Sequence, residues 1–96
     1  MNRLALRARL VRHLLARLTP SGLRVQDFGF HFHGTVVEAM SERMLDFEFE
    51  ARAVGAVAER LAAVPLGATL RMSAFLAPSS RGARRLRIHI TDFEVE

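Results

Sequence analysis

The first eighteen residues alternate between apolar and cationic side chains, and this alternation limits the folds that are open to the chain. Apolar side chains recur at every second position, at Leu4, Leu6, Ala8 and Leu10. The intervening positions include three arginines, Arg3, Arg7 and Arg9. Because successive side chains of a β-strand point to opposite faces, this period predicts a strand over residues 3–18 with one face in a core and the other in water. The two sides become mixed near Val11, where we expect the strand to bend.

Four later segments are also expected to be strands, over residues 23–34, 43–53, 67–77 and 84–95. The segment 43–53 alternates most cleanly, and its outer side is mostly acidic, at Asp46, Glu48 and Glu50. The last segment changes phase near Thr91. Its inward side chains are expected to be Leu86, Ile88, Ile90 and Phe93. We interpret the stretch from Gly34 to Glu42 as a connection between two strands.

Five phenylalanines of the second and third strand segments share one phase with Leu45 and Ala51, which assigns them to the core. These residues are Phe28, Phe30, Phe32, Phe47 and Phe49. Removal of a buried phenylalanine side chain typically costs about 3–5 kcal/mol, so Phe47→Ala is expected to unfold the domain.

Between residues 54 and 64 the apolar period changes from two to that of a helix, which Pro65 ends. Turns are predicted at residues 19–22, Thr-Pro-Ser-Gly, and at residues 78–82, Pro-Ser-Ser-Arg-Gly. The order of three strands, one helix and two strands predicts an all-β protein, a five-stranded OB-fold Greek-key barrel, with residues 1–96 as a single domain. Such barrels bind oligonucleotides on the face of strands two and three and with neighbouring loops.

The charge balance is strongly basic, because 14 arginines face 10 acidic residues and lysine is absent. Arginine suits forked contact with phosphate and stacking on bases, although a GC-rich coding genome would equally favour it over lysine. The absence of cysteine excludes disulfides, thiolate metal sites and a thiol nucleophile. No stretch approaches the roughly 18 apolar residues of a membrane span, and arginines interrupt the N-terminal apolar run. We therefore expect a cytoplasmic protein that does not associate with membranes.

An ordered set of residues along almost the whole chain resembles the primosomal replication protein N (PriB) family, relatives of bacterial single-stranded DNA-binding proteins. The matching residues are Asn2-Arg3-Leu4, Leu6, Arg12, Pro20-Ser21-Gly22, Phe28, Glu38-Ala39, Arg43, Gly55, Gly67, Phe75, Gly82, His89 and Glu94. The resemblance implies a homodimeric, non-enzymatic accessory of replication restart, without a cofactor. Its implied partners are single-stranded DNA, a restart helicase and other primosome proteins.

The resemblance also implies the residues that contact nucleic acid. Basic positions of the family fall on Arg12, Arg17, His33 and Arg85, and Arg81 and Arg84 would keep the last loop positive, offering charge to phosphates. Together with Arg43, the candidate nucleic-acid-binding residues are Arg12, Arg17, His33, Arg43, Arg81, Arg84 and Arg85. For Arg3, Arg7 and Arg9 a structural role is expected instead, because the family dimerises partly through its first strand.

The chain departs from the family at one position that matters for binding. An exposed tryptophan of the third strand, which stacks on bases in the family, aligns with Asp46, and two further acids share that face. Loss of one stacked base typically costs about 1–3 kcal/mol, and carboxylates repel phosphates. We therefore expect DNA binding that is weaker or relocated. The alternative is a protein–protein adaptor with little nucleic-acid affinity, which recruits its partners through the acidic strand.

Two constellations invite a metal or catalytic interpretation. His31 and His33 share a strand face, but two ligands without a third make a poor metal site, and we interpret them as exposed polar residues. The carboxylates of Asp46, Glu48 and Glu50 could serve acid–base or magnesium chemistry, yet no nucleophile constellation or phosphate loop accompanies them. We therefore expect neither a catalytic nor a metal site.

Overall fold

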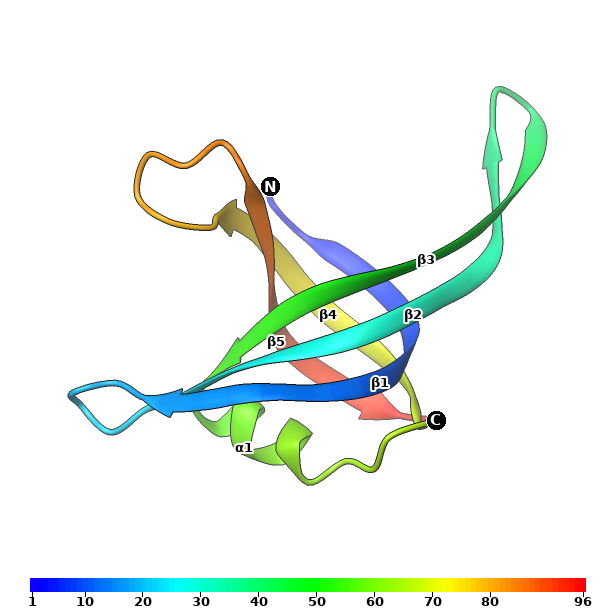
Figure 1. Cartoon of the computed structure of the whole chain (residues 1–96). Helices are drawn as coiled ribbons and strands as arrows, with labels where there is room; N and C mark the ends of the chain where they lie inside the picture. The colour runs from blue at the N-terminus through cyan, green and yellow to red at the C-terminus, as the bar shows by residue number, and fades with distance from the viewer.

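Five strands close into a barrel, and one short helix lies at one end of it (Figure 1). The computed structural model describes all of residues 1–96. The elements are β1 (Leu4–Leu18), β2 (Arg24–Glu38), β3 (Ser41–Val54), α1 (Ala56–Ala62), β4 (Thr69–Pro78) and β5 (Leu86–Val95). Neighbouring strands follow the order β1-β2-β3-β5-β4, and β4 pairs with β1 to close the barrel. The OB-fold predicted from the pattern of alternation, with its helix between the third and fourth strands, is confirmed.

Both predicted changes of phase coincide with irregularities in strand pairing. The β1–β2 register shifts between Leu10 and Arg12, so Val11 lies at the expected bend. The β4–β5 register shifts where Ser73 pairs with Asp92 and Ala74 pairs with Ile90, which leaves Thr91 as the additional residue. Such irregularities increase strand twist and curvature, as a small barrel requires.

The core lies inside the barrel and beneath the helix. The fully buried large side chains are Leu10, Phe28, Phe30, Leu61 and Leu70. Gln26 is the only buried polar side chain, and both ends of its amide are satisfied: Nε2 donates to the Leu14 carbonyl at 3.1 Å, and Oε1 accepts from Arg24 Nε at 3.0 Å. The barrel interior is therefore an apolar core without an unsatisfied polar group.

The helix is shorter than the period predicted. Val54 ends β3 and is exposed, and Gly55, at φ 75°, separates the strand from the helix. Positive φ is accessible to glycine without a steric penalty, so the chain changes direction there. The helix then places Ala58 and Leu61 in the core, as predicted.

The prediction of a connection at Gly34–Glu42 is wrong. β2 and β3 continue their pairing outward to Glu38–Ser41, and the turn is made by Ala39 and Met40, at φ 52° and 64°. The turn carries none of the usual Gly or Asn residues, so no local motif indicates a tight hairpin. Residues 34–45 form what we call the β2–β3 arm, which extends away from the barrel at the upper right of Figure 1.

Two residues assigned to the core lie outside it. Phe47 is 44% exposed, and Leu86 is 62% exposed. Phe47 pairs with Phe32 near the base of the arm, beyond Arg9–His31, the last pair that β1 forms with β2. Leu86 is the first residue of β5 and pairs with Pro78 beside the loop. In each case the side chain points to the predicted side of its strand, but the neighbouring element that would cover it ends before that residue.

Candidate nucleic-acid interface

The outer face of β1, β2 and β3 carries cations and acids that are paired with one another. Arg12 Nη2 lies 2.6 Å from Glu48 Oε1. Asp46 accepts hydrogen bonds from His31 Nε2 at 2.5 Å and from His33 Nδ1 at 3.2 Å. These hydrogen bonds, that of His31 first, lower the pKa of Asp46 below its ordinary value. The acidic strip of β3, which we define as Asp46, Glu48 and Glu50, is therefore already partly engaged by side chains of β1 and β2.

Three of the predicted nucleic-acid residues are engaged in this way. Arg12 is held by Glu48, His33 by Asp46, and Arg43, on the β2–β3 arm, by Glu38. The hydrogen bond from Arg12 also lowers the pKa of Glu48, which keeps that carboxylate charged. A phosphate at these positions would compete with a carboxylate that is already in place.

The other four predicted residues have no carboxylate within ion-pair distance. Arg17 lies near the end of β1, beside the β1–β2 turn. Arg81, Arg84 and Arg85, which we call the loop arginines, lie in the loop between β4 and β5 and are exposed. Both connections lie on the left of the barrel in Figure 1, opposite the β2–β3 arm. The structure thus separates the predicted set into a paired group on the strands and an unpaired group at the loops.

Sequence reasoning missed a row of residues that crosses four strands on the outer surface. Strand pairing aligns Asp27 of β2 with Arg52 of β3, Arg52 with His89 of β5, and His89 with Phe75 of β4. The residues flanking Arg52, Ala51 and Ala53, are buried, so the row faces outward. We call these four residues the outer row. Their alignment depends on strand register, and no local motif reveals it.

The outer row combines an ion pair with an aromatic stack. Arg52 binds Asp27 through two hydrogen bonds, from Nε at 2.8 Å and from Nη2 at 3.3 Å. The rings of Phe75 and His89 are nearly parallel, at 9°, with 4.9 Å between centroids. Burial, followed by the charges of Arg52 and Arg87, lowers the pKa of His89. The His89 ring is therefore neutral at physiological pH.

Cations surround the single carboxylate of the outer row. The hydrogen bond from Arg52 is the main cause of the lowered pKa of Asp27, and the charges of Arg87 and Arg17 act in the same direction. Arg17, Asp27 and Arg52 also line a hollow of about 200 Å³ with Leu15 and Val25. Arg87 Nη1 donates to the Ser79 carbonyl at 2.7 Å, which ties the loop to β5. The outer row thus adjoins Arg17 through this hollow, and Arg87 links its β5 side to the β4–β5 loop.

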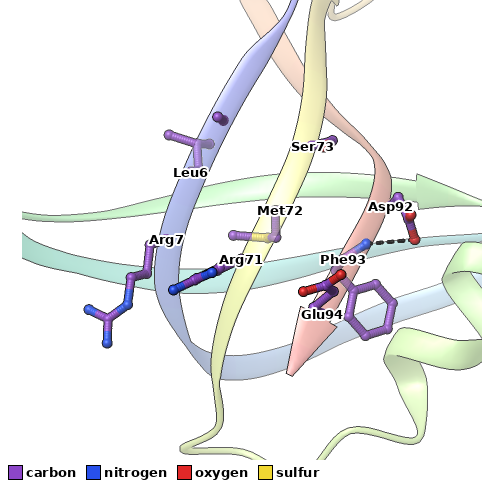
Figure 2. A pocket seen from close by; sticks show the side chains of 9 residues that line it. Leu6, Arg7, Arg71, Met72, Ser73, Asp92, Phe93 and Glu94 are labelled. Atoms are coloured by element: carbon purple, nitrogen blue, oxygen red, sulfur yellow. Dashed lines mark hydrogen bonds between the residues drawn. The ribbon is translucent and has the colours of Figure 1, made fainter. Parts of the chain in front are cut away.

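A hollow of about 380 Å³ lies between β1, β4 and β5 (Figure 2). Arg7 and Arg71 line it together with Asp92 and Glu94, and both arginines donate to Glu96, at 2.6 and 3.3 Å. It contains none of the predicted nucleic-acid residues and presents both signs of charge. A second hollow, about 350 Å³, places His31 and His33 beside Arg7 and Arg9.

Two further structural findings bear on the sequence predictions. Nowhere do three His, Asp or Glu side chains come close enough together to ligate a metal ion. The chain has no helix with the length and apolar character needed to cross a membrane.

Comparison with known proteins supplies independent information. A family model described as another single-strand binding protein family matches residues 2–92. Replication restart protein PriB of Bordetella pertussis is 33% identical over 90 residues, which cover 94% of this chain and 84% of that protein. Replication restart protein PriB of Nitrosomonas europaea is 30% identical over 79 residues, which cover 82% of this chain and 73% of that protein.

Solved structures agree with these matches. The crystallised PriB from Ralstonia solanacearum has 32% identity and a TM-score of 0.88, covering 100% of this chain and 98% of its own. The wild-type single-stranded DNA binding protein from Thermus aquaticus, at 18% identity and a TM-score of 0.76, covers 100% of this chain and 50% of its own. At that identity the second likeness shows a shared fold alone.

Proposed function

Since the chain belongs to the replication restart protein PriB family of single-strand binding proteins, we propose that it binds single-stranded DNA as a non-enzymatic accessory of replication restart. The names of its relatives and of the matching family support the restart role and the binding of single strands. The OB-fold supports the ligand class, because these barrels bind oligonucleotides through one face and adjacent loops.

The observation that carries this proposal is the unpaired state of the loop arginines. Arg81, Arg84 and Arg85 have no acidic partner, whereas Arg12, His33 and Arg43 are each held by a carboxylate. Unpaired arginines can neutralise phosphates and release condensed counterions. DNA therefore binds chiefly at the β4–β5 loop and near Arg17, displaced from the acidic third strand.

A homodimer is supported by an unpaired strand edge. Residues 4–8 of β1 pair with β4 along one edge, but pairing of β1 with β2 begins only at Arg9. An exposed edge of this kind pairs readily with another strand, and two-fold pairing of two copies would cover both edges at once. We include dimerisation through residues 4–8, and contact with a restart helicase and other primosome proteins, in the proposed function.

A second candidate, an adaptor with little nucleic-acid affinity, is favoured by the ion pairs on the strand face. Three of the seven residues expected to contact DNA, Arg12, His33 and Arg43, already lie against a carboxylate. In this case partners would bind the acidic strip, and DNA would contribute little.

Fluorescence anisotropy with oligo-dT over a salt series tests the proposal. The variant Arg81→Gln/Arg84→Gln/Arg85→Gln is compared with Arg12→Gln/Arg43→Gln/Arg71→Gln, which removes the same charge from paired arginines. We expect micromolar binding by the wild type, a large loss for the loop variant with a salt slope smaller by about 3, and a small loss for the control. Equal losses would contradict the assignment to the loop.

Helicase binding distinguishes the two candidates. If oligo-dT affinity is negligible in both the wild type and the loop variant, while binding to a restart helicase is unchanged, the adaptor is correct. If both interactions weaken in the loop variant, DNA and helicase share the cationic surface.

A further inference from the structure

The aromatic pair of the outer row is unusual in its surroundings. The stacked rings of Phe75 and His89 are half-buried on the outer surface, outside the apolar core, and charged side chains lie beside them. Arg52 follows His89 in the row, Arg87 lies two residues before it on β5, and Arg17 lies near Asp27. Flat rings beside arginines are the combination that binds single strands, because bases stack on rings and phosphates bind cations.

We propose that the outer row is a nucleobase-binding platform, on which a base of single-stranded DNA stacks with the Phe75–His89 pair. Arg87 and Arg17 hold the adjoining phosphates, and the loop arginines continue the path of the strand. This inference rests on the proposed function and names the side chains that would contact bases.

The balance of charge favours the outer row over the other exposed aromatic pair. Phe32 and Phe47 also lie close together, with 5.3 Å between centroids, at the base of the β2–β3 arm. The predicted DNA contacts on the arm and at its base, Arg43 and His33, lie against the carboxylates of Glu38 and Asp46. In the outer row, by contrast, Asp27 is the only carboxylate and Arg52, Arg87 and Arg17 act on it together.

The protonation of His89 fits this role. Burial and the flanking arginines lower the pKa of His89, so its ring is neutral at pH 7 and can lie parallel to another ring without charge repulsion from Arg52 and Arg87. The resemblance described above implies a stacking tryptophan at the position of Asp46, and in this chain Asp46 instead accepts hydrogen bonds from His31 and His33. The platform would thus provide stacking at a different place on the same barrel.

Photo-crosslinking of the wild-type protein to oligo-dT containing 5-iododeoxyuridine tests the contact directly. Peptide mapping is expected to place the crosslink in β4 or β5, at Phe75 or His89. A crosslink confined to Phe32 or Phe47 would place the stacked base on the arm and overturn the proposal. This measurement needs no variant and therefore does not depend on how well a variant folds.

Binding by Phe75→Leu, with Phe47→Leu as the matched control, provides the second test. We expect Phe75→Leu to lower affinity for oligo-dT on the order of tenfold, and to leave affinity for an abasic oligomer of equal length unchanged. Phe47→Leu should change both affinities less than twofold, and circular dichroism verifies that each variant is folded. Equal effects of the two variants would overturn the platform. If wild-type protein binds no oligo-dT at all, the proposed function itself fails, whereas binding without any dependence on Phe75 overturns only the platform.

Discussion

Arg12 of β1 reaches across β2 to Glu48 of β3, with 2.6 Å between Nη2 and Oε1. On its way the Arg12 side chain passes over Gly29 of β2, which pairs with Arg12 on one side and with Glu50 on the other. A Cβ atom at position 29 would lie 2.9 Å from Arg12 Nε and 3.2 Å from Arg12 Cβ, closer than side chains normally approach. The absence of a side chain at Gly29 thus gives the arginine its route to the acid, and it withdraws a predicted phosphate ligand from DNA.

Glu48→Gln should therefore strengthen binding to oligo-dT and increase the salt slope by about 1, because the freed Arg12 can neutralise a phosphate. The thermal midpoint should change little, since both side chains are exposed. Glu42→Gln is the matched control, because it removes the same charge without releasing a cation. Identical affinity gains in the two variants would mean that net charge, and not the release of Arg12, is responsible.

Phe47→Ala and Phe30→Ala should differ in their effects on stability. Phe30 is completely buried, and its removal should lower the free energy of unfolding by about 3–5 kcal/mol. Phe47 is 44% exposed, so its removal should cost only about 1–2 kcal/mol. Urea unfolding of both variants provides the measurement, and equal losses would show that the arm is covered in solution.

The two phenylalanines illustrate what could be predicted from the sequence. The phase of Phe47 and the order of the strands follow from local alternation, and so does the irregularity at Thr91. Burial depends on where neighbouring strands end, which local alternation does not report. The contacts of Arg12 with Glu48 and of His33 with Asp46, and the alignment of Phe75 with His89, depend on the register between strands, so no local pattern could predict them.

Acid stability should depend on Asp27. The hydrogen bond from Arg52 lowers the folded-state pKa of Asp27 below the unfolded value of about 4. The stabilisation is therefore complete above the unfolded pKa, and it is lost as pH falls through the lower folded pKa. In thermal melts between pH 5 and pH 2, Asp27→Asn should start less stable and decline less steeply than the wild type. Glu50→Gln, at an exposed acid without an ion-pair partner, is the control, and parallel decline of Asp27→Asn and wild type would contradict the assignment.

Hydrogen exchange should reveal the free edge of β1. If two copies pair along residues 4–8, amides of this segment should be protected at high protein concentration and should exchange faster on dilution. Amides of β2 and β3 near Phe28 should not respond to concentration, because they pair within one chain. Sedimentation equilibrium over the same range checks the association, and a monomer at every concentration would exclude the dimer.

Only two residue pairs, Ala51–Ile88 and Arg52–His89, join β3 to β5. The β2–β3 ladder, by comparison, is continuous from Val25–Val54 to Glu38–Ser41. Separation of β3 from β5 over so short a contact breaks few backbone hydrogen bonds. These two strands can therefore separate locally while every other pair of strands stays hydrogen-bonded. The width of the barrel can consequently change at the contact between β3 and β5. A bound molecule that crosses this contact would stiffen the barrel by holding the two strands together.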